Sequence, residues 1–188
     1  MAITISSIVA LVRCLIGDTA KSMVPGDIFT FDNSNIFTLS ESNATAVTDV
    51  IVNDVSSSVV YTYTQPRQSV NVSSTLTTGD TVEIQYAYYP NYSDTEIQDY
   101  IHAAIIHLSS NSYYDFTISG DNIYPDPSTS EQRLIAIVAA LLIEPDNKTY
   151  RLPDLTINVP KDVPLHDKIR KAILMYKINT HGTFTILD

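Results

Sequence analysis

Apolar residues recur at helical spacing at the beginning of the chain and again through its second half. The first set predicts a helix over residues 4–16, and Gly17 can end it because glycine readily adopts a left-handed conformation. The apolar positions of this helix are Ile5, Ile8, Val9, Val12, Leu15 and Ile16. A single helix cannot bury such a stripe alone, so we expect it to pack on the later helices.

From residue 24 onward the pattern changes to short β-branched and aromatic runs, separated by turn-forming clusters of Asn, Gly and Pro. The runs cover residues 28–31, 36–39, 47–52, 59–64, 69–73 and 81–88. This pattern is typical of a small antiparallel sandwich or barrel.

Three more helices are predicted after this block. Residues 93–96 and 128–131 both read Ser-x-x-Glu, the spacing of a capping box, in which the two side chains bond to amide groups at a helix start. They predict helices over 93–109 and 128–144. Pro164 is well placed in the first turn of a fourth helix.

The predicted fold class is α+β, a small helical bundle with an antiparallel β module inserted between helices one and two. Residues 1–23 and 91–188 form the helical domain, and residues 24–90 form the inserted β domain. Two domains in series are a weaker alternative, because the first helix would then have no partner.

Some aliphatic residues lie opposite the apolar stripe of their own helix. At about 100° per residue, Ile106 does so on the second helix, and Leu174 and Ile178 do so on the fourth. The third helix is apolar almost all round. Exposed apolar patches often mark interfaces, so we predict that these three residues contact neighbouring subunits. The alternative is a buried third helix with a few scattered exposed aliphatics.

Composition narrows the range of functions. Cys14 is the only cysteine, so the chain can form neither an internal disulfide nor a cysteine-built zinc site. The net charge of −10 disfavours sequence-specific DNA binding. Residues 1–144 hold 4 basic and 16 acidic groups, whereas residues 145–188 hold 7 and 5. No apolar run approaches the roughly 18 residues that span a bilayer, so we expect no membrane segment.

Catalytic signatures are absent from the sequence. It has no Gly-x-Ser-x-Gly, no glycine-rich phosphate loop and no His-Glu-x-x-His. His102 and His107 are five positions apart, a spacing that does not point two ligands at one metal ion. Asp94, Glu96 and Asp99 could serve a small hydrolase, but acids in a first turn ordinarily compensate the helix dipole. We predict no enzyme and no catalytic, cofactor or metal site.

Tyrosines gather in the β block. They are Tyr61, Tyr63, Tyr86, Tyr88, Tyr89 and Tyr92. Tyrosine suits strands because it packs its ring while its hydroxyl stays polar, so packing explains the cluster. A recognition surface for carbohydrate or protein is the alternative.

The residues around the start of the second helix resemble a known family. Residues 76–86, LTTGDTVEIQY, followed by residues 89–101, YPNYSDTEIQDYI, and Ala104, resemble head-to-tail adaptor (connector) proteins of tailed bacteriophages. A leading helix with Arg13 and Asp18 and two later helices fit the same pattern. The β module replaces the short loop that joins the first two helices of smaller, all-helical adaptors.

The resemblance implies a structural protein at the head–tail interface of a virion, assembled in the host cytoplasm. Such adaptors form a homo-oligomeric ring, typically of twelve subunits, between the portal protein and a tail or neck protein, and DNA passes through the lumen during ejection without specific contacts. A terminal segment commonly grips the portal, which here points to Phe184, Ile186 and Leu187, with the chain's own β block as the alternative partner of these residues. No cofactor is implied. The alternative function is a β-sandwich module that binds glycan or another virion protein.

Overall fold

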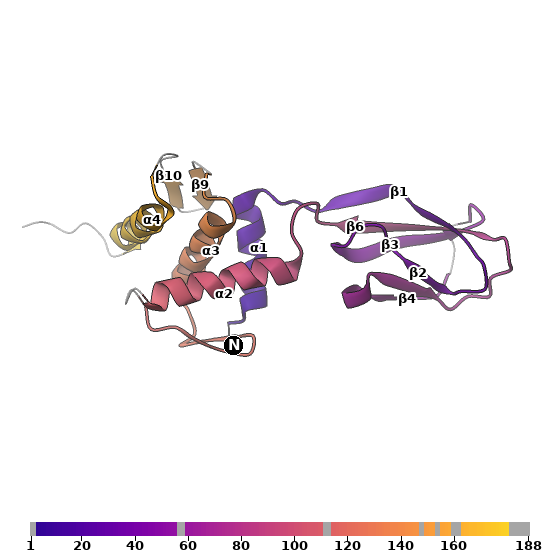
Figure 1. The fold of residues 1–188 in the computed structure, drawn as a ribbon, viewed down its shortest axis with the longest axis horizontal. Helices are drawn as coiled ribbons and strands as arrows, with labels where there is room; N and C mark the ends of the chain where they lie inside the picture. Colours follow the sequence, from indigo (N-terminus) through magenta and orange to yellow (C-terminus); the bar gives the residue numbers. More distant parts are fainter. Residues whose placement is uncertain are drawn as a thin grey trace, which may run out of the picture. The chain divides into compact units, whose positions relative to one another are not determined.

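The computed structural model describes residues 3–55, 59–110, 114–146, 149–152, 155–158 and 163–180 (Figure 1). Within these ranges the side chains of residues 66, 150–152, 155–158 and 175–180 are not described. The chain divides into two compact units, a helical unit, Met1–Asp18 with Asp94–Asp188, and a β unit, Thr19–Ser93. The predicted α+β class, with a β module between the first two helices, is confirmed. The division falls slightly outside the boundaries that were expected at residues 24 and 90.

Helix α1 (Ile5–Ile16) begins one residue later than predicted and ends at Gly17, as predicted. The Thr4 hydroxyl accepts a hydrogen bond from the Ser7 amide at 3.2 Å, and Gly17 ends the helix with φ of 72°. The apolar stripe of α1 is buried. The helix therefore depends on partners that follow the β unit in sequence.

Helix α3 (Thr129–Ile143) is the centre of the helical unit. It packs against α1, against α2 (Asp94–Ser110) and against α4 (Leu165–Thr180), as Figure 1 shows. Every side chain from Leu134 to Leu141 is buried. The apolar character of α3 on all sides is thus accounted for within one chain, which removes it from the evidence for subunit contacts.

The capping box predicted at residue 128 is present. The Ser128 hydroxyl accepts from the Glu131 amide at 3.3 Å, and the Glu131 carboxylate accepts from the Ser128 amide at 2.7 Å. Two orphan amide groups at the start of α3 are satisfied in this way, which fixes where the buried helix begins.

Two short hairpins complete the helical unit. Strands β7 (Thr117–Ser119) and β8 (Asn122–Tyr124) form the first. The amide of Ile123 donates to the carbonyl of Ile3 at 3.1 Å, so this hairpin anchors the segment that leads into α1. Strands β9 (Thr149–Leu152) and β10 (Leu155–Asn158) form the second hairpin, which sequence analysis missed.

The β unit contains two three-stranded antiparallel sheets. One has the order β1 (Lys21–Thr30), β6 (Thr81–Tyr88), β3 (Ala44–Val52), and the other β2 (Ile36–Thr38), β5 (Ser69–Val72), β4 (Tyr61–Thr64). Their buried side chains form one shared core, which makes the unit a small sandwich. This core contains Phe31, Phe37, Leu39, Ala44, Val50, Val70, Val72, Val82, Ile84 and Tyr86.

Strand β1 begins earlier than predicted, because it runs through Pro25 and Gly26. Its register with β6 shifts between Met23 and Asp27, which is the signature of a bulge on an edge strand. The Gly26 amide donates to the Glu83 carboxylate at 2.9 Å, and this bond is the main cause that lowers the pKa of Glu83. The backbone of Gly26 lies so close to β6 that a Cβ there would be 2.1 Å from the Ile84 carbonyl oxygen.

We expect Gly26→Ala to destabilise the β unit, because the methyl group must displace backbone rather than a flexible side chain. Overpacking of this kind costs about 1–3 kcal/mol. Urea-induced unfolding of the full chain measures the change, and Ser22→Ala, at an exposed position of the same strand, is the control. Equal stability of the two variants would show that β1 does not approach β6 so closely.

Candidate functional site

A buried ion-pair cluster lies at the end of α1. Arg13 is only 4% exposed, and its guanidinium is paired with Asp18 and with Asp94. Nη2 and Nε both donate to one carboxylate oxygen of Asp94, at 2.6 and 3.2 Å. Charge-assisted hydrogen bonds such as these are stronger than neutral ones. Arg13 and Asp18, the residues of the first helix that fit the adaptor pattern, are therefore direct partners.

The position of this cluster in the chain is significant. Asp18 is the last residue of the helical unit before the β unit, and Asp94 is the first residue after it. Arg13 consequently pairs with Asp18, where the chain leaves the helical unit, and with Asp94, where it returns. Asp94 accepts these bonds, so its carboxylate has a structural role that accounts for it without catalysis.

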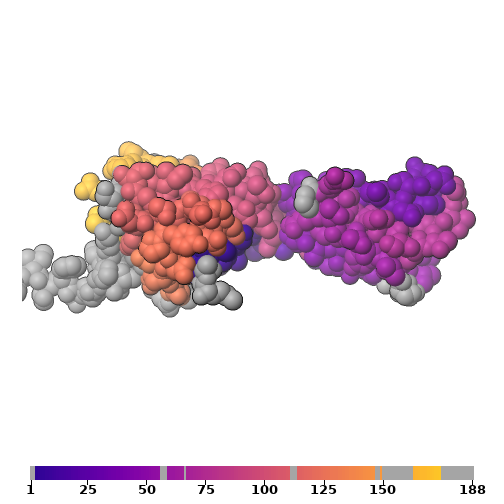
Figure 2. Space-filling model, turned by 90° about the horizontal axis from the view of Figure 1, so that it is seen from below, coloured from indigo at the N-terminus to yellow at the C-terminus, as the bar shows by residue number. Residues whose placement is uncertain are grey.

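Two of the three predicted subunit contacts lie at the surface of the helical unit. Ile106 is 60% exposed on α2 and Leu174 is 51% exposed on α4. Figure 2 shows that both helices reach the surface. Ile178 belongs to α4, but its side chain is outside the described residues, as are Phe184, Ile186 and Leu187 entirely. Their roles in subunit and portal contacts stay predictions.

Histidines of α2 and α4 meet where these two helices approach each other. The rings of His107 and His166 have centroids 6.1 Å apart in an edge-to-face arrangement. Burial, and secondarily the charge of His166, lowers the pKa of His107. Across the part of the chain that the structure describes, no three His, Cys, Asp or Glu side chains gather to hold a metal ion.

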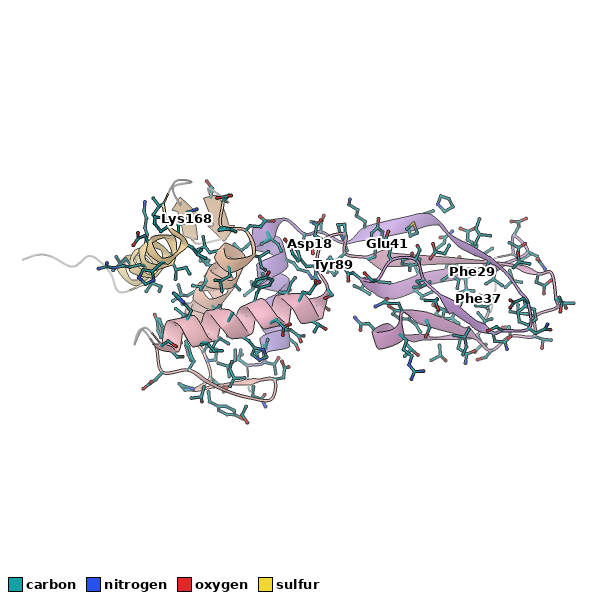
Figure 3. All side chains as sticks on the ribbon, in the orientation of Figure 1. Asp18, Phe29, Phe37, Glu41, Tyr89 and Lys168 are labelled. Atoms are coloured by element: carbon teal, nitrogen blue, oxygen red, sulfur yellow. The ribbon has the colours of Figure 1, made fainter. Side chains whose placement is uncertain are left out.

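Lys168 on α4 is a buried cation that sequence reasoning did not single out (Figure 3). Its ammonium donates to the carbonyl of Pro145, just after the end of α3, and lies 3.9 Å from the exposed carboxylate of Asp146. Cations at a helix C-terminus are favourable because the unpaired carbonyls there carry partial negative charge. Lys168 therefore attaches α4 to the end of the central helix.

Tyrosines of the β unit pack inward rather than forming an exposed surface. Tyr86 is fully buried, and its hydroxyl bonds to Asp27 and Ser40, each at 3.0 Å. Burial is the main cause that raises the pKa of Tyr86. Tyr63 donates to the Ala44 carbonyl at 2.6 Å. The other tyrosines of the cluster are half-buried, so packing explains the cluster better than a recognition surface does.

The β unit also has a polar groove with a volume of about 620 Å³. It is lined by Phe31, by Asn33 and Asn35 in the turn after β1, and by residues 73–78. Serine, threonine and asparagine predominate in this lining, and none of its residues is charged. A smaller groove is bordered by Phe29 and Phe37, which Figure 3 labels. The centroids of these two rings lie 5.2 Å apart.

None of the helices in the described ranges is long and apolar enough to cross a membrane. Comparison with models of known protein families found no match, and comparison with curated proteins found none either. The geometry itself therefore carries the functional argument: a tightly closed helical unit with exposed aliphatic residues on two of its helices.

We expect Arg13→Leu to destabilise the helical unit strongly, because it leaves the carboxylate of Asp18 buried without its partner. Removing one member of a buried pair costs about 3–5 kcal/mol. Asp94→Asn is the matched control and should cost much less, since the side chain of Asp94 is 43% exposed and its amide can still accept a bond. Thermal unfolding of the full chain measures both, and equal losses would contradict this account of the cluster.

The contact between the rings of His107 and His166 predicts that the stability of the folded chain depends on pH. The pKa of His107 is lowered in the folded chain, so folding favours its neutral form. The resulting stability is present above the unfolded pKa of about 6.5 and is lost as the pH falls through the folded pKa. Ring-proton NMR titration should place His107 below 6.5, with His166→Ala bringing it closer to that value. A His107 that titrates at or above 6.5 would rule out this packing.

Proposed function

We propose that this protein is a structural head-to-tail adaptor of a tailed bacteriophage. Its subunits form a ring beneath the portal protein, join the capsid to the tail and leave a passage for DNA. The observation that carries the proposal is the exposure of Ile106 and Leu174 on a helical unit whose central helix is already covered on every side. Among the residues that the structure describes, these two aliphatic side chains are left largely uncovered.

The helix order and the residues that resemble adaptors support the same function. The resembling stretch covers most of strand β6 and the first half of α2, and the Arg13–Asp18 pair joins α1 to the residue that follows its Gly17 cap. The net charge of −10 suits a passage that must not hold DNA tightly, because each phosphate bound by a cation adds free energy that movement must overcome. The role is structural and non-catalytic.

In this proposal the more basic region, residues 145–188, faces protein partners. It includes α4 and the terminal residues Phe184, Ile186 and Leu187, which we assign to the portal contact. Twelve subunits is the expected ring size. The assembled protein belongs to the head–tail interface of the virion.

A second candidate function is favoured by the polar groove of the β unit. Hydroxyl and amide groups without net charge are suited to hydrogen bonding with sugars. The β unit would then be a recognition module that binds glycan or another virion protein. A chain that stays monomeric and binds glycans would favour this function over the adaptor.

We expect size-exclusion chromatography with light scattering to show a particle that contains about twelve copies of the 20.8 kDa chain, to which the mass of the portal protein is added where the portal is present. Leu174→Asp should weaken the assembly and leave the fold intact, because burying a leucine contributes about 1.5–3 kcal/mol to each interface. Val60→Asp, at an aliphatic residue of the β unit that is 63% exposed, is the control. A chain that remains monomeric with portal protein present would contradict the proposal.

A further inference from the structure

The polar groove of the β unit is built by two connections between strands. Residues 31–35, which join β1 to β2, supply part of its lining, and residues 73–78, between β5 and β6, supply the rest. Strand β1 begins at Lys21 opposite Tyr88, where the chain enters and leaves the unit, and ends at Thr30 opposite Thr81. The groove therefore lies at the other end of the β unit. Loops that a rigid scaffold gathers in this way are common binding sites.

Hydrogen bonds hold the two connections together. The Phe31 amide donates to the Asp80 carbonyl at 2.9 Å, and the Gly79 amide donates to the Phe31 carbonyl at 3.1 Å. The Thr78 hydroxyl donates to the side-chain oxygen of Asn33 at 3.2 Å. The groove is thus formed before a ligand arrives, which reduces the entropy lost on binding.

Several polar groups of this lining are available to a ligand. The side chains of Asn35, Thr75 and Thr77 are exposed, and none of them hydrogen-bonds to another residue in the part of the chain that the structure describes. Phe31 and Leu76, the apolar members of the lining, belong to or pack against the core of the unit. Amide, hydroxyl and apolar groups together match the hydroxyl groups and C–H surfaces of a sugar ring.

The distribution of charge favours a neutral ligand. No residue of the lining is charged, and the β unit as a whole has seven acidic and two basic residues. The two basic residues lie at the end away from the groove, Lys21 opposite Tyr88 and Arg67 in the turn between β4 and β5. An anionic ligand would therefore meet a negative field with no cation to compensate it.

A peptide strand fits the groove less well than a sugar. Peptides that extend a sheet pair with free backbone amides and carbonyls. Both backbone groups of Phe31 are already paired, and the Asn35 carbonyl accepts from the Val72 amide at 2.9 Å. A sugar can instead use the side-chain groups that the lining offers.

We propose that this groove binds a neutral saccharide, whose hydroxyl groups bond to the side chains of Asn35, Thr75 and Thr77. The inference rests on the second candidate function and gives it a site and a ligand class. It does not depend on ring formation, so an adaptor subunit can carry the same site.

A glycan microarray probed with the full chain tests the ligand class. The array carries neutral oligosaccharides of glucose, galactose, mannose and N-acetylglucosamine, together with sialylated and sulfated forms of the same sugars. We expect binding to at least one neutral oligosaccharide and weaker binding to its charged forms. Charged forms that bind as strongly as the neutral ones would contradict the proposal. An array without any binding would overturn both this site and the second candidate function, whereas the adaptor proposal is decided separately by light scattering.

Substitutions in the groove test the location. Asn35→Ala and Thr75→Val should each weaken binding of the neutral oligosaccharide about three- to tenfold, because each removes one hydrogen-bonding side chain. Thr62→Val, the same change as Thr75→Val at an exposed position of β4 outside the lining, is the control and should bind normally. Circular dichroism verifies that every variant folds. Binding that is unchanged in both groove variants would overturn this site and leave the β unit a glycan-binding module.

Discussion

The helical unit exists only if a chain that leaves it after Asp18 returns to it at Asp94, and the buried guanidinium of Arg13 binds both of these residues. Helix α1 lies before the β unit, whereas the helices that cover its apolar stripe lie after it. The β unit satisfies the same constraint from its own side, because Lys21 at its beginning pairs with Tyr88 near its end on adjacent antiparallel strands. The insertion therefore costs little loop-closure entropy beyond its own folding.

Covering α3 determines what is left at the surface. Helices α1, α2 and α4 pack around α3, and Lys168 attaches α4 to its end, so the residues at the centre of α3 are buried. The exposed residues of α2 and α4 include the aliphatics Ile106 and Leu174, acids on α2, and charges of both signs on α4. Exposed aliphatic side chains are a common feature of surfaces that contact other proteins.

Periodicity and capping signals predicted most elements because both are local. The bounds of α1 and the capping box of α3 follow from residues a few positions apart. The partners of Arg13 do not, since Asp94 lies 81 positions away and no local pattern indicates a contact over that separation. Periodicity also shows that Ile106 lies off the apolar stripe of its helix, but it does not show whether another element covers this residue. For α3 the other helices do cover the additional apolar residues, so these are not evidence for subunit contacts.

Strand β1 shows a second limit of local signals. Pro25 and Gly26 usually end a strand, but on an edge strand a bulge accommodates both, and the Glu83 carboxylate takes up the free amide of Gly26. Sequence analysis missed Lys168, which precedes the apolar residue Ile169 on α4. Its burial is explained only by the nearby end of α3, where its ammonium donates to the carbonyl of Pro145.

Electron cryomicroscopy of portal-bearing capsids incubated with the purified chain tests the central claim most directly. The account predicts a closed ring of added density beneath the portal, with the helical unit forming the contacts between subunits and with a lumen in which acidic and neutral polar side chains predominate. Capsids whose portal vertex stays bare, or a ring whose lumen is dominated by lysine and arginine, would contradict it.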